Sequence, residues 1–198
     1  MTTIRKAKAN DAGDFAELML ISAPYFSTLF GKKVKTLLQN LFKCQFNLFS
    51  FDHVYFAEID GKVTGMILGY DWQTKKRENV RTGFLLFKKL GISILGRLLA
   101  LIKLNETVGR LEDGEYYISN IATYPKHRGK GIGRRLLLEA EQETKVIGVE
   151  KIVLDVEKDN VNAINFYRNL GYKILEEFSI SLRRIKIINF YRMAKELK

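Results

Sequence analysis

The second half of the chain alternates short β-rich runs with amphipathic helical runs, and this alternation limits the possible folds more than any other feature. We expect strands at residues 116–123, 151–156, 173–180 and 186–194, and helices at residues 131–147 and 160–170. Strands that alternate with helices predict a sheet that is covered by helices rather than an all-helical bundle or a sandwich of two sheets.

The first half predicts an antiparallel start to the same sheet. Two β-rich runs, 54–59 and 63–70, meet at Asp60-Gly61, a dipeptide typical of a tight hairpin turn. A short strand at 3–7 and helices at 11–21 and 33–43 are expected before this hairpin, and a further helix at 84–104 after it. We therefore expect an α/β fold with three layers, in which a mixed, mostly antiparallel, twisted sheet has helices on both faces.

We expect a single domain over residues 1–198, with a helical insertion at about 75–112, because no linker or internal repeat divides the chain of 198 residues. One cysteine excludes an internal disulfide framework, and two histidines leave little for a metal site, so no metal is expected. The 33 Lys and Arg against 22 Asp and Glu give a net charge of +11, which favours an anionic partner such as nucleic acid, a phosphate-bearing cofactor or an acidic membrane surface.

No integral membrane segment is expected. The N-terminal residues carry charges where an export signal needs an apolar stretch. Residues 84–104 are the most apolar run, but Lys88, Lys89, Arg97 and Lys103 interrupt them. A membrane span needs about 20 predominantly apolar residues, so a cytoplasmic location is expected.

The loop after the strand at 116–123 carries the strongest chemical signal. Gly129, Gly131 and Gly133 occupy every second position and lead directly into a helix. Glycines let backbone amides turn toward one point, and the first amides of a helix are unpaired, so this turn predicts a pyrophosphate site. Four cations flank the glycines, namely Arg128, Lys130, Arg134 and Arg135. The alternative is a flexible basic turn at the start of a helix.

Two segments carry a resemblance to a known family. Residues 128–133 match the cofactor signature Arg/Gln-x-x-Gly-x-Gly/Ala of the GNAT superfamily of acyl-CoA-dependent N-acetyltransferases, and residues 118–125 look like the strand that precedes it there. Residues 160–172 are similar to the second cofactor segment of that family, Asn-x-x-Ala-x-x-x-Tyr followed by a Gly-aromatic turn. The resemblance is strongest over residues 115–178, and the first half matches only in its order of elements.

The resemblance implies acetyl-CoA as co-substrate and assigns residues to it. The pyrophosphate would be held by Arg128 and the main-chain amides of Gly129, Lys130, Gly131, Ile132, Gly133 and Arg134. The main chain of Ile121, Ala122 and Thr123 would pair with the pantetheine arm as an added strand does, and an amide of Ile121 or Ala122 would donate to the thioester oxygen. Asn160 would hydrogen-bond pantetheine, cap its helix, or do both.

Tyr167 is the candidate general acid, since a phenol can protonate a departing thiolate, and core packing is the rival role. Some members of the family use a glutamate as base at the position of Tyr117, and this sequence departs from that pattern. Alternation along the strand puts Glu115, Tyr117 and Ser119 on one face, so we expect Glu115 to act as base through water, with Tyr117 as the second candidate. Alternatively, Glu115 is only a solvated residue at the start of the strand, and the ring of Tyr117 only packs against the sheet.

These inferences predict an N-acetyltransferase that transfers the acetyl group of acetyl-CoA directly to an amine in a sequential mechanism. No acyl-enzyme is expected, because no Cys or Ser stands beside a base. The acceptor could be a protein N-terminus, a lysine or a small amine, and a homodimer is left open. Asp155 and Glu157 are expected at the solvent side or the ladder edge and are given no role.

The alternative function is a non-catalytic basic module that binds phosphate groups or nucleic acid. Residues 75–77 and the cationic side of 84–104 motivate this alternative, while the dispersion of the basic residues along the chain argues against it.

Overall fold

The computed structural model describes residues 2–91, 107–182 and 186–197. The strands are β1 (Thr2–Lys6), β2 (Val54–Ile59), β3 (Lys62–Asp71), β4 (Glu115–Thr123), β5 (Lys151–Glu157), β6 (Lys173–Leu182) and β7 (Lys186–Glu196). They form one seven-stranded sheet in the order β1-β2-β3-β4-β5-β7-β6. Only β4 and β5 run parallel, and all other neighbours are antiparallel. The predicted mixed, mostly antiparallel sheet is thus confirmed.

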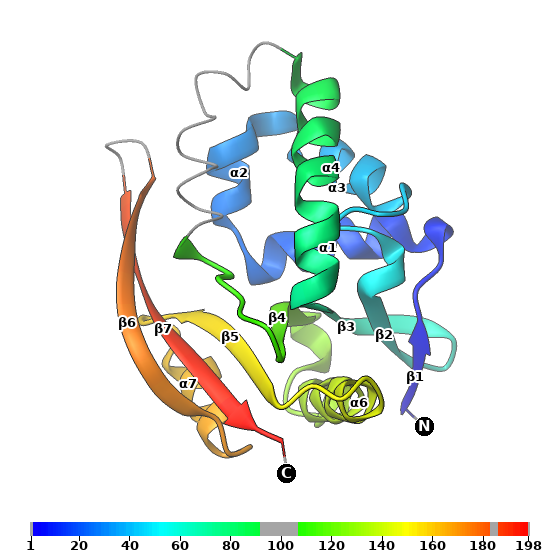
Figure 1. Ribbon diagram of the computed structural model, residues 1–198. Coiled ribbons are helices and arrows are strands. Elements are labelled where there is room, and N and C mark those ends of the chain that lie inside the picture. The colour runs from blue at the N-terminus through cyan, green and yellow to red at the C-terminus, as the bar shows by residue number, and fades with distance from the viewer. Residues whose placement is uncertain (1, 92–106, 183–185, 198) are drawn as a thin grey trace.

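Helices cover both faces of this sheet. They are α1 (Ala12–Ser22), α2 (Tyr25–Phe30), α3 (Val34–Phe42), α4 (Trp72–Leu90), α6 (Ile132–Val146) and α7 (Val161–Arg168). Figure 1 shows α1 to α4 on one side of the sheet and α6 and α7 on the other, which confirms the three layers. Each layer has its own core against the sheet, built around Phe15, Phe42 and Phe56 on one face and around Leu136 and Leu137 on the other.

In the first half of the chain, the sequence predicts the hairpin turn between β2 and β3 but not the short helix α2. The hairpin turn between β2 and β3 is confirmed, since Asp60 and Gly61 have φ angles of 50° and 71°. The short helix α2 was not predicted. It lies between Pro24 and Gly31, and six residues are too few for a helical period to stand out in the sequence.

The helix predicted at 84–104 begins much earlier, at Trp72, and α4 is traced to Leu90. The Asp71 carboxylate caps it by accepting a hydrogen bond from the backbone N–H of Thr74 at 2.6 Å. The expectation failed at this end because the first turns of α4 are strongly polar and lack an apolar stripe. The part of the prediction at 92–106 lies outside the described residues. Within the described ranges, no helix combines the length and apolar character that a membrane crossing requires.

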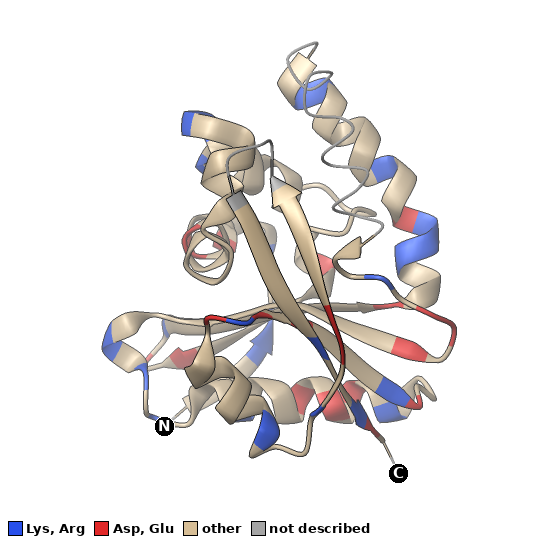
Figure 2. Cartoon of the chain, turned by 90° about the vertical axis from the view of Figure 1, so that its left-hand side faces the viewer, with Lys and Arg blue, Asp and Glu red and all other residues tan. Residues whose placement is uncertain are grey.

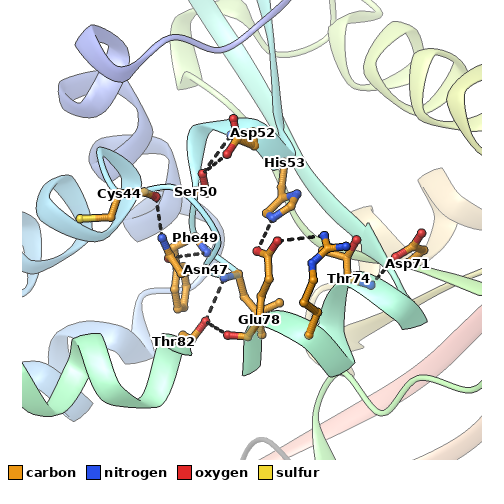
Figure 3. Close-up of polar contacts among 12 residues, drawn as sticks. Cys44, Asn47, Phe49, Ser50, Asp52, His53, Asp71, Thr74, Glu78 and Thr82 are labelled. Carbon is orange, nitrogen blue, oxygen red and sulfur yellow. Dashed lines mark hydrogen bonds and ion pairs between the residues drawn. The ribbon is translucent and has the colours of Figure 1, made fainter. Parts of the chain in front are cut away.

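A buried polar cluster fixes α4 to the segment before β2 (Figure 3). Glu78 on α4 contacts the His53 ring nitrogen Nε2 at 2.7 Å. One turn later, the Thr82 hydroxyl accepts a hydrogen bond from the backbone N–H of Leu48 at 2.9 Å and donates to the Glu78 carbonyl at 2.8 Å. Glu78 and Thr82 are both buried, so the helix is held by polar contacts where apolar packing would be usual.

The parallel pair at the centre of the sheet is incomplete. β4 and β5 pair from Glu115 and Lys151 only as far as Ile118 and Leu154. On the other edge of β4, β3 pairs with Asn120 and then with Ile118, so Ser119 is an extra residue that forms a β-bulge. The bulge bends β4, and an opening forms between the carboxyl ends of the two parallel strands.

Candidate functional site

A cavity of about 580 Å³ occupies the opening between β4 and β5. Its walls are the last residues of β4 (Ser119–Thr123), the last residues of β5 (Leu154–Glu157), the turn before α6 and the first turns of α7. Residues from α1 and α2 close the side above the sheet, including Ser22 and Tyr25. The two segments that carried the sequence signals, 128–133 and 160–172, therefore meet at one cavity.

The glycine turn has the backbone geometry of an anion site. Gly129 and Gly131 have φ angles of 76° and 74°, and a Cβ atom at either position would meet no atom within 4 Å. The N–H of Arg135 bonds the Gly131 carbonyl at 3.2 Å, which is the first bond of the α6 ladder. The amides of residues 132–134 therefore lie outside the helix's own hydrogen bonding, as is usual at a helix N-terminus.

The seven residues of this turn that were predicted to bind the cofactor do not all border the cavity. Six of the seven line the cavity, namely Arg128, Gly129, Gly131, Ile132, Gly133 and Arg134. Lys130 is exposed and is not part of the wall. Arg135, which we also counted as a flanking cation, donates instead to the Thr2 carbonyl at 3.2 Å. In Figure 2 the Lys and Arg positions along the described part of the chain recur at several separate places and are not confined to one element.

The end of β4 presents a free edge to the cavity. Ile121, Ala122 and Thr123 pair with β3 on one side, opposite Ile67, Met66 and Gly65. On the other side these residues have no partner in β5, because the pairing of β4 with β5 ends at Ile118 and Leu154. All three residues line the cavity. An extended ligand could add to this edge through main-chain hydrogen bonds.

Tyr167 and Asn160 lie on the α7 side of the cavity. Tyr167 is buried, and its ring packs against Phe166 and Tyr172 at centroid distances of 5.3 and 5.8 Å. None of the described residues hydrogen-bonds its hydroxyl, and burial raises its pKa. Asn160 caps α7 by accepting a hydrogen bond from the N–H of Ala163 at 3.2 Å, and it also lines the cavity.

The two predicted bases occupy different environments. Glu115 does not line the cavity, because its carboxylate contacts the Lys151 ammonium at 2.7 Å and Arg192 at 3.6 Å. Tyr117 does line it, and its hydroxyl donates to Asp155 at 3.2 Å. Burial, followed by the charge of Asp155, raises the pKa of Tyr117 well above its usual value.

Glu115 and Tyr117 lie on one face of β4, since Arg192 contacts both Glu115 and Asp155 and Tyr117 donates to Asp155, but only part of this face borders the cavity. Tyr117 and Ser119 both line the cavity, whereas Glu115 does not. Ser119 is the bulge residue, so strict alternation along β4 ends there.

Asp155 is a buried part of the cavity wall, so the solvent-side alternative was wrong, whereas the ladder-edge alternative agrees with the end of the β4–β5 pairing at Leu154. Its side chain is 1% exposed. Its carboxylate accepts hydrogen bonds from the Gly109 N–H at 2.6 Å and from Tyr117, and it lies 3.5 Å from Arg192. Burial raises the pKa of Asp155, although the Gly109 amide and Arg192 counteract this shift. Alternation along an otherwise apolar strand was the signal that could have identified Asp155 and Glu157, which both line the cavity.

Comparisons with known proteins agree on one family. A model of the acetyltransferase (GNAT) family matches residues 16–172. The uncharacterized N-acetyltransferase YobR of Bacillus subtilis is 25% identical over 129 residues, which cover 65% of this chain and 48% of YobR. The chain thus spans about half the length of this curated relative, and less of the next two.

Solved structures share the fold over the whole chain. An N-acetyltransferase from Staphylococcus aureus has a TM-score of 0.70 at 22% identity, with 98% of this chain and 100% of that chain covered. The structure of yncA from Salmonella typhimurium with its cofactor acetyl-CoA has a TM-score of 0.60 at 17% identity, with 100% of this chain and 94% of that chain covered.

Proposed function

Because the chain belongs to the acetyltransferase (GNAT) family, we propose that it is an N-acetyltransferase that uses acetyl-CoA. The observation that carries this proposal is the cavity, whose wall joins a glycine turn at a helix N-terminus to the free edge of β4. The family membership favours an enzyme over the alternative of a non-catalytic basic module. The dispersion of the basic residues along the sequence supports the same choice.

The residues present fit acetyl-CoA. The open turn at Gly129 and Gly131, with unpaired amides behind it, suits a diphosphate, and Arg128 and Arg134 would add charge attraction. The edge of β4 at residues 121–123 suits the pantetheine arm. When bound, acetyl-CoA supplies an acetyl thioester whose carbonyl carbon forms a bond to the acceptor nitrogen and loses its bond to sulfur.

We propose that Tyr167 supplies the proton that the departing sulfur requires. Tyr167 lines the cavity, and none of the described residues bonds its hydroxyl, so the hydroxyl has no protein partner to give up when a ligand binds. Since burial raises its pKa, the phenol is protonated at neutral pH, which is the form that an acid needs.

For the base, the geometry supports Tyr117 together with Asp155. A tyrosine with a raised pKa is neutral and can accept a proton only if it gives up its own. The hydrogen bond from Tyr117 to Asp155 provides that route, and the raised pKa of Asp155 makes it a better proton acceptor than an ordinary aspartate. Glu115 stays a predicted base, but its contacts with Lys151 and Arg192 leave it less available than Tyr117.

The proposed acceptor is an amine: a protein N-terminus, a lysine or a small amine. Transfer would be direct, with both substrates bound together, because one cavity adjoins both the cofactor turn and the Tyr117–Asp155 pair. The amine proton would pass to the Tyr117 oxygen as the Tyr117 proton passes to Asp155.

Cofactor binding tests the proposed function. Gly131→Glu should abolish binding of acetyl-CoA, because the side chain and its negative charge would occupy the pyrophosphate site. In the unmodified chain, acetyl-CoA at about 100 times its dissociation constant should stabilise the fold by about 2.7 kcal/mol. A thermal-shift titration together with calorimetry would measure both effects.

Gly148→Glu is the matched control. Gly148 has a φ angle of 73°, nearly that of Gly131, and open space for a side chain, but it lies beyond the other end of α6. Both variants should therefore be strained alike, and only Gly131→Glu should lose the cofactor. Unchanged acetyl-CoA affinity in Gly131→Glu would contradict the assignment of the turn.

A further inference from the structure

The cavity has walls of opposite charge. Arg128 and Arg134 line the side at the start of α6, and Asp155 and Glu157 line the side at the end of β5. The cationic side suits the cofactor phosphates. The anionic side faces the region left for the acceptor, beside Tyr117 and Tyr25.

The two carboxylates on β5 differ in what they already contact. Asp155 is occupied by the Gly109 amide, Tyr117 and Arg192. Among the described residues, none donates a hydrogen bond to the Glu157 carboxylate or forms an ion pair with it. The cation that follows it in sequence, Lys158, pairs with Glu177 at 2.7 Å. Glu157 is therefore a negative charge in the cavity wall that a ligand can neutralise.

Glu157 and Asp155 line the same part of the cavity, because the charges of both act on Tyr25. Burial and the charges of both carboxylates raise the pKa of Tyr25, which lines the cavity opposite them. Residues two apart on a strand point to the same face and lie about 6.6 to 6.8 Å apart along it. The same cavity wall includes the apolar residues Ile21, Val108 and Phe190.

We propose that Glu157 selects a small diamine as the acceptor, by binding the protonated nitrogen that does not react. This inference rests on the proposed function. The reacting amine would lie at the Tyr117–Asp155 pair, and the second ammonium group would pair with Glu157. A chain of about four methylene groups spans the spacing of the two carboxylates, and it would lie in a cavity whose wall includes apolar residues. Binding compensates a carboxylate that is otherwise partly desolvated and unpaired.

The test compares two acceptors that differ by one ammonium group, 1,4-diaminobutane and butylamine. With the unmodified protein, kcat/KM should be about tenfold or more higher for the diamine. Glu157→Gln should remove most of this preference by raising KM for the diamine, while kcat/KM for butylamine should change much less. Calorimetry with 1,4-diaminobutane in the presence of CoA should show the same loss of affinity without turnover.

Two further variants keep the test decisive. Asp159→Asn removes the same charge from an exposed neighbour outside the cavity and should leave the preference intact. Glu157→Asp retracts the carboxylate by one methylene group and should shift the preference toward 1,5-diaminopentane. This variant also serves if Glu157→Gln does not fold.

The outcomes separate this inference from the proposed function. If no amine or peptide is acetylated and acetyl-CoA does not bind, the proposed function itself fails. If acetyl-CoA binds but the two small amines react equally, or only a peptide N-terminus reacts, the diamine inference is overturned and the proposed function stands. An unchanged preference in Glu157→Gln would overturn it as well.

Discussion

Tyr117 and Tyr167 line the same cavity, and their different surroundings give them different chemistry. Tyr117 donates to Asp155, whereas the Tyr167 hydroxyl has no partner among the described residues. Burial raises the pKa of both phenols. Tyr167 could be found from sequence because it stands in a local motif. Alternation along β5 could single out Asp155 as a polar residue in an apolar strand, but not its place beside the cavity, because that depends on where β4 and β5 separate in space.

At this scale we predict that Tyr167→Phe lowers kcat by about 10²-fold, the usual contribution of a general acid. The affinity for acetyl-CoA should change little, because the ring remains. Tyr172→Phe is the control: the Tyr172 hydroxyl is buried with no hydrogen-bond partner in the described structure, so its removal should affect neither quantity. Steady-state kinetics and calorimetry would measure both. Turnover at the unmodified level in Tyr167→Phe would remove this residue from the acid role.

At the scale of elements, local signals predicted what local physics controls. The Asp60-Gly61 turn, the Asn160 cap and the glycine start of α6 all depend on a few neighbouring residues. The bulge at Ser119 and the bond that joins Thr82 of α4 to Leu48 depend on partners that are distant in sequence. α4 also reaches the site, since the Lys75 ammonium donates to the Gly109 carbonyl at 2.6 Å, next to Val108 in the cavity wall.

We predict that Thr82→Val destabilises the fold by about 1 to 3 kcal/mol, because the buried N–H of Leu48 would lose its only acceptor in the described structure while the side-chain volume stays the same. Thr74→Val makes the same change on α4 at a hydroxyl for which the described structure has no hydrogen bond, and it should stay within about 0.5 kcal/mol. Urea denaturation of both variants would measure the difference. Equal midpoints would show that the polar cluster of Figure 3 does not anchor α4.

At the scale of the whole molecule, the strand alternation was enough to predict the layers and the class of sheet. It could not predict the strand order, because β7 inserts between β5 and β6 through pairings that join residues far apart in the chain. The site follows from this order: β5 is held by β7 along its full length, while it leaves β4 after four pairs. The net charge of +11 adds a long-range attraction for anions.

This charge predicts a salt dependence. The affinity for acetyl-CoA should fall about threefold or more between about 0.05 and 0.3 M salt, because screening weakens the attraction of the phosphates to Arg128, Arg134 and the overall field. Pantetheine has no phosphate group, so its weak binding should change little. The double variant Arg128→Gln with Arg134→Gln should bind acetyl-CoA more weakly and with less sensitivity to salt. Calorimetry at several salt concentrations would measure these affinities. An affinity for acetyl-CoA that does not change with salt would contradict this prediction.

The early separation of β4 and β5 determines which molecules can reach the unpaired edge of β4. An exposed strand edge in the interior of a sheet, rather than at its rim, is screened from other protein chains by the walls around it, yet water can still reach it. The chain therefore keeps peptide groups without a strand partner on this side of β4, where the walls of the cavity hinder pairing with another protein chain. A narrow extended ligand can enter the cavity and hydrogen-bond to the free edge of β4. A β-strand of another protein is too wide to enter.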